Sequence, residues 1–154
     1  MAKPTFQTPY DSNPIFNPPM PFVQNFGGLY PNKMIVISGI PISSILRSSR
    51  FTINFEHGDD IAFHFDVRFD GNVIVRNTQQ RGIGWGREER DSEWFPFSHD
   101  VWFEMMIKVE TSSFKVAVNN QHLLEYCHRL QPLGRFDSLR ITGDLRLTQV
   151  RFHG

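Results

Sequence analysis

The sequence predicts an all-β protein, either a sandwich of two antiparallel sheets or a barrel. Short segments that alternate between apolar and polar residues, or are continuously apolar, follow one another from Phe22 onward. Turn-forming residues such as Gly58-Asp59-Asp60 and Gly143-Asp144 separate them, and no long window has helical periodicity. Many short strands with regular turn signals are typical of a β-sandwich or a β-barrel.

The expected strands differ in pattern. Met34–Ser38 is continuously apolar, whereas Phe51–Glu56 and Ile61–Phe69 alternate with a period of two, as strands with one buried face do. Asn119-Asn120 predicts a tight hairpin, because asparagine tolerates positive φ. The remaining expected strands are Val73–Thr78, Arg90–Glu93, Trp102–Val109, Phe114–Val118, Gln121–Cys127, Ser138–Thr142 and Leu145–Phe152.

Residues 1–21 are expected to form a proline-rich arm without regular structure, ahead of a single domain at 22–154. Proline recurs throughout this stretch and favours extended backbone. Phe16 and Phe22 are expected to lay the arm on the domain. The stretch lacks the apolar run of a secretory signal, and no apolar run in the chain is long enough to span a bilayer.

The composition excludes several classes of partner. With 154 residues the chain is long enough for one core, and its 16 basic and 16 acidic residues give a net charge of zero. Nothing therefore suggests nucleic acid or an anionic membrane as a partner. Cys127 is the only cysteine, which excludes an internal disulfide and favours a reducing compartment. The six histidines have no metal-ligand spacing, so we expect no metal and no cofactor.

The strand Ile61–Phe69 has an unusual polar face. Its phenylalanines are expected to fill the core, and its opposite face presents His64, Asp66 and Arg68, about 6–7 Å apart. An ordinary solvated face would favour Thr, Lys and Ser. Several rigid hydrogen-bonding groups suit a small polar ligand with one apolar face, such as a sugar.

Neighbouring segments are expected to extend this face. If the strands on either side pair with it through short turns, they add Arg50, Thr52, Asn54, Glu56 and Asn77 to the same surface. Trp85 lies between Gly84 and Gly86, so its indole is expected to be exposed. Exposing an indole beside polar strands is costly unless a ligand stacks on it. Glu88 and Arg90 follow shortly after.

Each of these residues also has an ordinary explanation. His64 alone would be a surface or core histidine, and Asp66 with Arg68 an exposed ion pair of little energetic value. Trp85 alone would be a core or lid aromatic. Their combination on adjoining segments is what favours a ligand site.

Catalysis is not expected from these residues. Asp66 and Glu88 would serve a glycosidase only if one carboxyl stayed protonated, whereas the neighbouring arginines favour the charged form of both. Cys127 and His128 are adjacent in a strand and face opposite sides, so they do not form a nucleophile and base. The sequence has no phosphate-binding loop and no nucleophile elbow.

The order and spacing of the polar residues resemble those of a known family. His64-x-Asp66-x-Arg68, Val75-x-Asn77 and Trp85-x-x-Glu88-x-Arg90 are closely similar to the carbohydrate-recognition domain of the galectins, with His-x-Asn-Pro-Arg, Val-x-Asn and Trp-x-x-Glu-x-Arg. The resemblance extends over about residues 20–152 and includes His128-Arg129-Leu130. It implies a jelly-roll sandwich, similar to the concanavalin-like lectins, with a β-galactoside such as lactose or N-acetyllactosamine on its concave sheet. It also implies that no metal is needed and no bond is broken.

The resemblance implies a role for each residue of the site. His64 and Arg68 would bond the axial O4 of galactose, which selects against glucose because a mismatched hydroxyl leaves buried donors without partners. Asn77 and Glu88 would bond O6, and Trp85 would stack on the galactose ring. Around the next sugar, a charged network would form from Arg68, Glu88 and Arg90. Family members differ in glycan preference beyond the galactose, where this chain has Arg50, Thr52, Asn54 and Glu56.

Two residues depart from the family pattern. Asp66 stands in place of Asn and Val67 in place of Pro, and only Asp66 lies on the sugar face. An ionised Asp accepts hydrogen bonds but cannot donate them. Asp66 would either accept a bond from the sugar O4 hydroxyl or pin Arg68 in a salt bridge. Loss of one hydrogen bond to a charged partner costs about 1.5–3 kcal/mol, so the second role would weaken binding.

Two functions follow as hypotheses. The first is a β-galactoside-binding lectin without enzymatic activity. The second, motivated by Asp66, is a galectin-fold interaction or structural protein with weakened or altered sugar binding. A lectin crosslinks only with more than one site. We therefore expect a homodimer, association through the proline-rich arm, or a second recognition domain in a longer protein. The resemblance further implies cytoplasmic synthesis and export to the cell exterior without a signal peptide.

The departure at Asp66 leads to a testable expectation. From the sequence, Asp66→Asn should strengthen lactose binding, because the amide supplies a donor that the carboxylate lacks. Calorimetric titration of both proteins with lactose measures the difference.

Overall fold

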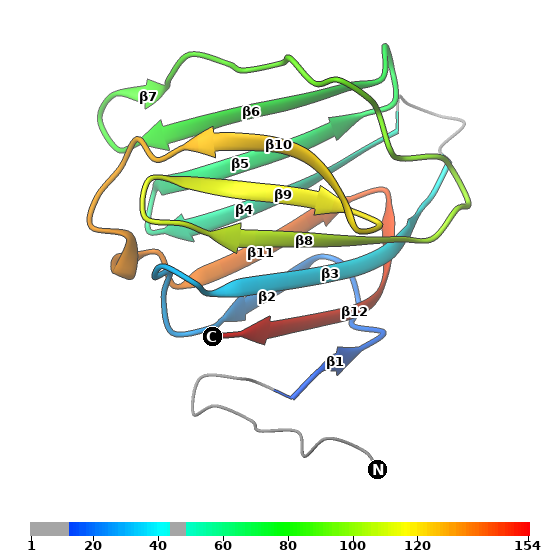
Figure 1. Ribbon diagram of the computed structural model, residues 1–154, viewed down its shortest axis with the longest axis horizontal. Helices are drawn as coiled ribbons and strands as arrows, with labels where there is room; N and C mark the ends of the chain where they lie inside the picture. The colour runs from blue at the N-terminus through cyan, green and yellow to red at the C-terminus, as the bar shows by residue number, and fades with distance from the viewer. Residues whose placement is uncertain (1–12, 44–48) are drawn as a thin grey trace.

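Two six-stranded antiparallel sheets lie face to face in the computed structural model, which describes residues 13–43 and 49–154 (Figure 1). One sheet has the order β1 (Ile15–Phe16), β12 (Leu145–His153), β3 (Met34–Pro41), β8 (Phe103–Val109), β9 (Ser113–Val118) and β10 (Gln121–Cys127). The other has the order β2 (Phe22–Asn25), β11 (Ser138–Gly143), β4 (Arg50–His57), β5 (Asp60–Arg68), β6 (Val73–Gln80) and β7 (Gly84–Trp85). The predicted all-β sandwich is confirmed, and the open sheets exclude the barrel.

Aromatic side chains from both sheets fill the space between the layers. Phe63 of β5 stacks on Phe114 of β9 with ring centres 4.7 Å apart, and Phe51 of β4 stacks on Phe103 of β8 at 5.7 Å. All four rings are essentially fully buried. Burial of this much apolar surface dominates the free energy of folding, and the stacked pairs add a smaller specific contribution. The alternation in β4 and β5 is what sends these rings inward and their polar neighbours outward.

Most expected strands are present within a residue or two of their predicted ends. Asn119 and Asn120 have φ values of 51° and 64° and form the predicted hairpin between β9 and β10. The expected strand at Arg90–Glu93 is wrong, because these four residues make no sheet pairing, and the isolated bridge to Arg76 is made by the preceding residue, Glu89. The sequence did not predict the short strands β1, β2 and β7 or the 3₁₀ turn η1 (Leu133–Arg135).

The expected arm without regular structure needs a correction at its end. Residues 1–12 lie outside the described part, but Ile15 and Phe16 form β1 and pair with Val150 and Gln149 of β12. Phe22 is buried as expected. Phe16, by contrast, is 66% exposed, and Ile15 packs against the core instead. Two residues are too few for the sequence to signal a strand, so this pairing depends on the neighbouring edge of β12.

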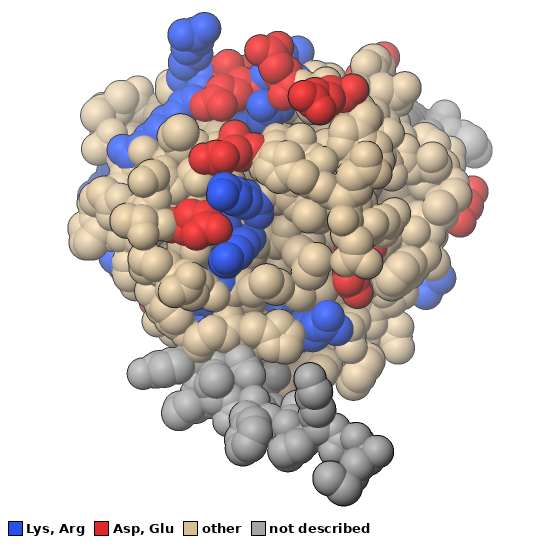
Figure 2. Space-filling model, viewed as in Figure 1, with Lys and Arg blue, Asp and Glu red and all other residues tan. Residues whose placement is uncertain are grey.

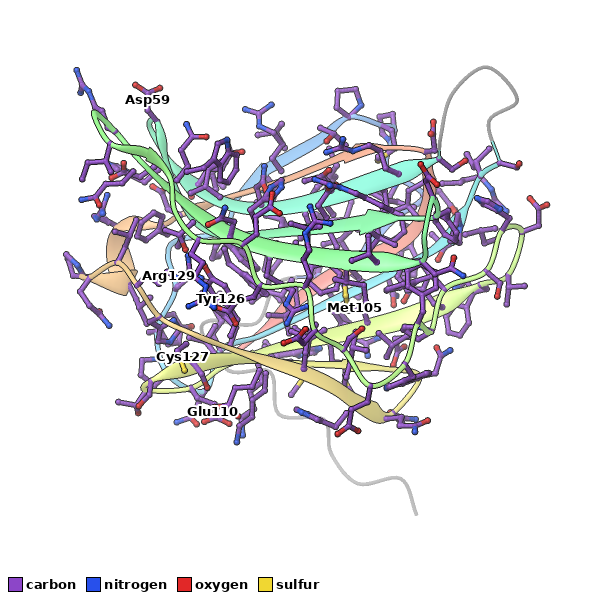
Figure 3. All side chains as sticks on the ribbon, turned by 90° about the horizontal axis from the view of Figure 1, so that it is seen from above. Asp59, Met105, Glu110, Tyr126, Cys127 and Arg129 are labelled. Atoms are coloured by element: carbon purple, nitrogen blue, oxygen red, sulfur yellow. The ribbon has the colours of Figure 1, made fainter. Side chains whose placement is uncertain are left out.

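The register of β4, β5 and β6 places the predicted polar residues in rows. Arg50 lies opposite Arg68, Thr52 opposite Asp66, and Asn54 opposite His64, and Asn77 of β6 follows in the row of His64. The sheet that contains these strands bends so that its outer face is concave (Figure 3). The expectation that three neighbouring strands share one polar surface is therefore confirmed. Within residues 13–43 and 49–154 there is no helix long and apolar enough to cross a membrane.

The turn between β11 and β12 supports Arg50 at one end of this surface. Gly143 has a φ of +102°, and a Cβ there would overlap the Arg50 carbonyl oxygen and lie 2.8 Å from the Phe51 Cα. The Asp144 N–H donates to the Arg50 carbonyl oxygen at 2.7 Å. Glycine at 143 is thus required both by the backbone conformation and by the close approach to β4.

Gly143→Ala is expected to lower the free energy of unfolding by about 2–4 kcal/mol, because backbone strain adds to the overlap with β4. Gly82→Ala is the matched control. Gly82 has a φ of +78°, but a Cβ added there would meet nothing within 4 Å, so only the strain of about 1 kcal/mol applies. Denaturant unfolding of both variants measures the two costs, and equal losses would show that the contact with Arg50 and Phe51 has no effect.

Candidate functional site

A pocket of about 290 Å³ on the concave face collects most of the predicted site residues. Its lining consists of Arg50, His64, Arg68, Val75, Asn77, Trp85, Gly86 and Glu88. Strands β4, β5, β6 and β7 and the segment that follows β7 each contribute to it. A larger hollow of about 460 Å³ beside β10 contains none of the predicted residues. The concave pocket is therefore the candidate site.

Asp66 lies beneath this pocket rather than in its lining. It is 0% exposed, and its carboxylate accepts three hydrogen bonds. Arg50 Nη2 and Arg68 Nε each donate to Oδ2 at 2.8 Å, and the Thr52 hydroxyl donates to Oδ1 at 2.7 Å. Of the two roles considered for Asp66, the structure displays the salt bridge to Arg68. A sugar contact by Asp66 stays a prediction.

The Asp66 carboxylate offsets the repulsion between two arginines that are neighbours in the sheet. Arg50 and Arg68 are direct neighbours on antiparallel strands, and like charges in that position repel each other. A buried carboxylate that bonds both guanidinium groups offsets the repulsion and fixes the direction of each side chain. As a result, both arginines line the pocket with part of their donors still available.

His64 is held as a neutral ring with a defined orientation. The Asn54 amide nitrogen donates to Glu56 Oε2 at 3.2 Å, so the Asn54 oxygen faces His64 Nδ1, 2.7 Å away. This arrangement assigns the proton to Nδ1 and leaves Nε2 as an acceptor. Burial lowers the pKa of His64, and Arg50 and Arg68 lower it further against the opposing effect of two carboxylates, Asp66 and Glu88.

Trp85 forms the aromatic wall of the site. Its side chain is 49% exposed, and its ring centre lies 4.6 Å from that of His64 at an angle of 53°. The expectation of an exposed indole is confirmed. β7 pairs with the end of β6, which places the indole next to the row of polar residues on β5.

The segment 86–90, here called the strap, follows Trp85 and carries Glu88 and Arg90. Arg90 Nε and Nη2 donate to Glu88 Oε2 at 2.9 and 2.8 Å. Acidic and basic side chains mix at the edge of the molecule over the segment after β7 (Figure 2). Arg68 is bonded to Asp66 rather than to Glu88, so the expected network of Arg68, Glu88 and Arg90 is present only in its second half.

A second hollow of about 410 Å³ adjoins the pocket and shares Arg50 and Arg68 with it. Arg90 and Asp70 complete its charged lining. The two hollows are neighbours, because the same two arginines line both of them. Arg90 therefore lies beside the pocket, in its extension, rather than in the pocket itself.

The residues expected to meet sugars beyond the galactose are mostly bonded to their neighbours. Thr52 bonds Asp66, Asn54 bonds His64, and Glu56 accepts from Arg140 Nε of β11 at 3.1 Å. Only Arg50 of this group lines the pocket. The others hold the residues that do, and their direct contact with a glycan stays a prediction.

Asn77 has a partner that the sequence did not identify. It is 3% exposed, and its Oδ1 accepts a hydrogen bond from Arg129 Nη1 at 3.1 Å. Arg129 lies in the segment that follows β10 of the far sheet, so sequence distance gave no sign of the contact. Its only signal was its place in the galectin-like segment His128-Arg129-Leu130.

The chemistry of this site is that of a receptor for hydroxyl groups. It offers one neutral acceptor, two guanidinium groups, one amide, one carboxylate and an exposed aromatic face. Within residues 13–43 and 49–154, no cluster of three or more His, Cys, Asp or Glu could hold a metal ion. The donor set is suited to an uncharged polyol with an apolar face.

Comparison with known proteins places this site in a family. The galactoside-binding lectin family model matches residues 21–152. The chain belongs to the galectin family. Galectins are lectins rather than enzymes, and they bind β-galactoside glycans.

Several curated galectins and solved galectin structures are similar to the chain. Rat galectin-4 is 40% identical over 141 residues, which cover 90% of this chain and 42% of the relative. Mouse galectin-3 is 42% identical over 127 residues, covering 80% of this chain and 46% of the relative. The chain thus spans less than half the length of these relatives. Galectin LEC-6 of Caenorhabditis elegans superposes with a TM-score of 0.83 at 26% identity, covering 92% of this chain and 96% of that one. Sheep galectin-11, solved with glycerol, gives a TM-score of 0.79 at 29% identity, covering 87% and 98%.

The position of Asp66 reverses the sign of the effect expected from the sequence. An amide at this buried position does not face the pocket, while loss of the carboxylate releases two opposed arginines. Asp66→Asn is therefore expected to weaken lactose binding and to lower the free energy of unfolding by about 1–3 kcal/mol. Calorimetry with lactose and denaturant unfolding measure the two effects.

The matched control is Asp59→Asn, the same exchange at an exposed carboxylate in the turn before β5. It should change neither quantity. Tighter lactose binding by Asp66→Asn would show that the amide reaches the sugar, as the sequence alone suggested.

Proposed function

We propose that this galectin domain binds β-galactosides such as lactose and N-acetyllactosamine in the pocket on its concave face. The observation that supports the proposal most directly is the pairing of the His64 Nε2 acceptor with the Arg68 guanidinium donors in one pocket lining. A hydroxyl group donates one hydrogen bond and accepts others, so a neighbouring acceptor and donor match a single hydroxyl. The axial O4 of galactose is the hydroxyl assigned to this pair.

The selectivity for galactose follows from the cost of leaving these groups without partners. In glucose, O4 is equatorial and points away from the His64 and Arg68 pair. The site would then lose hydrogen bonds without regaining those to water, which discriminates steeply between otherwise similar ligands. The half-exposed Trp85 indole provides the surface on which the apolar face of the galactose ring stacks.

Arg50 takes a role in this proposal that the sequence gave only to the region beyond the galactose. Because Asp66 holds Arg50 against the pocket, its remaining guanidinium donors face the bound sugar. The family uses an Asn amide at position 66, and Arg50 supplies donor capacity that Asp66 lacks. The second sugar lies toward Glu88 and the hollow lined by Arg68 and Arg90.

The alternative function is an interaction or structural protein of the same fold with weak sugar binding. The burial of Asp66 beneath its three hydrogen-bond donors is the observation that favours it, since the family's amide donor is missing.

We propose no catalytic activity, because both carboxylates near the pocket, Asp66 and Glu88, form ion pairs with arginine. Crosslinking of glycoconjugates requires a second site, by dimerisation or from a further domain, and is proposed for the full-length protein, with cytoplasmic and extracellular locations.

Calorimetric titration with lactose tests the main proposal. We expect a dissociation constant below the millimolar range, and no binding of cellobiose, in which glucose replaces the terminal galactose. Trp85→Leu should reduce lactose affinity about tenfold or more through the lost stacking. The exposed Trp102, outside the pocket, provides the matched control as Trp102→Leu.

Absence of lactose binding at millimolar sugar would favour the alternative function. Equal binding of lactose and cellobiose would show that the pocket does not distinguish an axial from an equatorial O4.

The affinity for lactose should fall as the pH is lowered through the pKa of His64 in the folded protein, which lies below the usual histidine value of 6.5. Burial lowers the pKa of His64, so the folded pocket favours the neutral ring. This stabilising contribution is complete above the unfolded pKa and is lost as the pH falls below it. Protonation also turns the Nε2 acceptor into a donor. Titrations from about pH 7.5 down to the lowest pH at which the protein stays folded measure the effect.

His64→Gln should bind lactose more weakly but without this pH dependence. A constant affinity of the unmodified protein down to pH values at which the His64 ring is protonated would show that His64 Nε2 is not the acceptor.

A further inference from the structure

Arg129 is outside the set of residues expected to touch a sugar, yet it contacts Asn77 of the pocket lining and Glu89 of the strap. It follows β10 of the far sheet and lies with Tyr126 between the two layers (Figure 3). Its Nη1 donates to Asn77 Oδ1 at 3.1 Å, and its Nη2 donates to Glu89 Oε2 at 2.7 Å. The guanidinium carbon lies 4.9 Å from the centre of the Tyr126 ring. Arg129 thus connects the end of β10 in one sheet to β6 in the other.

One of these contacts fixes the strap. The backbone groups of Glu89 and Arg76 exchange hydrogen bonds of 2.8 and 2.9 Å, and the Arg129 ion pair holds the Glu89 side chain as well. A Cβ on Gly86 would lie only 3.0 Å from Arg129 Nη1, so glycine leaves the space in which the guanidinium packs. Glu88 lies between Gly86 and Glu89 in the strap and lines the pocket.

The other contact determines which way the Asn77 amide faces. Asn77 Oδ1 accepts from Arg129 and also from the Thr78 N–H at 2.8 Å, while Nδ2 donates to the Gly86 carbonyl oxygen at 2.9 Å. A guanidinium can only donate, so the amide oxygen must face it. The reversed amide would place an NH₂ group against two donors and an oxygen against a carbonyl. The second hydrogen on Nδ2 has no partner among the described residues, and Asn77 lines the pocket.

We propose that Arg129 is a positioning residue for ligand recognition, which directs the Asn77 amide N–H and the Glu88 carboxylate toward the exocyclic hydroxyl, O6, of the bound galactose. The inference rests on the proposed β-galactoside binding. The N–H donor and the carboxylate acceptor match one hydroxyl, as His64 and Arg68 match another. Because Arg129 has no contact with His64, Asp66 or Arg68 in the described structure, its effect is confined to the O6 half of the sugar.

Two ligands separate this role from a general structural one. The first is lactose, and the second is the same disaccharide with α-L-arabinopyranose in place of galactose, which lacks the C6 hydroxymethyl group and keeps O4. Arg129→Met retains most of the apolar side chain over Tyr126 and removes the donors. We expect a loss of lactose affinity of about tenfold and a change of less than about twofold for the arabinosyl ligand.

Arg135→Met is the matched control. Arg135 forms an ion pair of similar exposure with Asp60, at 2.6 Å, and lies outside the pocket lining. It should leave both affinities unchanged. Arg129→Lys retains the charge and an N–H donor group but not the planar fork of the guanidinium, so its lactose affinity should lie between those of Arg129→Met and the unmodified protein.

A double-mutant cycle shows whether Arg129 acts through the amide. Asn77→Ala should lower lactose affinity in the unmodified protein and have a much smaller effect in Arg129→Met, because the amide is no longer directed at O6. Thermal unfolding of each variant confirms that binding is measured on folded protein.

An equal loss for lactose and the arabinosyl ligand, or additive losses in the cycle, would overturn the inference and leave Arg129 a structural residue. Unchanged lactose affinity in Arg129→Met would overturn it as well. Failure of the unmodified protein to bind either ligand would instead reject the proposed function, and the inference with it.

Discussion

The binding face depends on one buried carboxylate. Asp66 lies at the centre of the pocket-forming strands, is fully buried, and bonds two arginines and a threonine. Without it, Arg50 and Arg68 would be cationic neighbours on adjacent strands with no counter-charge between them. Burial of a carboxylate is tolerable because its hydrogen bonds are short and charge-assisted. The family's Asn can accept hydrogen bonds but cannot offset two positive charges, so this chain orders its arginines by a different balance of charge.

The rest of the site is ordered by side chains that do not enter the pocket. Asn54 sets the tautomer of His64, and Arg129 orients the Asn77 amide together with the Thr78 N–H and the Gly86 carbonyl oxygen. Hydrogen bonds fixed in advance reduce the entropy lost on binding, which matters for the proposed recognition of mobile hydroxyl groups. The aromatic core serves the same end, because the stacked rings of β4, β5, β8 and β9 fix the strands from which the polar residues project.

The comparisons and the geometry agree on the class of protein and differ on detail. Galectin LEC-6 superposes over nearly the whole chain at 26% identity, as expected when core packing constrains a fold more than surface sequence does. The motif residues on the strands of the pocket have the spacing of the family pattern. The interior of the site differs from that pattern at Asp66 and in the hydrogen bonds around it. In the proposed function, sugar recognition therefore rests on shared strand positions and on this chain's own arrangement of charges.

The sequence by itself determined the all-β class, most strand positions and the row of polar residues on β5, because a period of two and turn residues are local signals. It did not determine β1, β2 and β7, since strands this short form only where a neighbouring edge is available. It also could not show that Asp66 is buried, because alternation assigns a residue to a face and not to a depth. Only the tertiary structure brought Arg50 over Asp66 and carried Arg129 from the far sheet to Asn77, contacts between residues 16 and 52 positions apart. Strand register and the approach of the two sheets decide such contacts, and neither can be read from the local pattern.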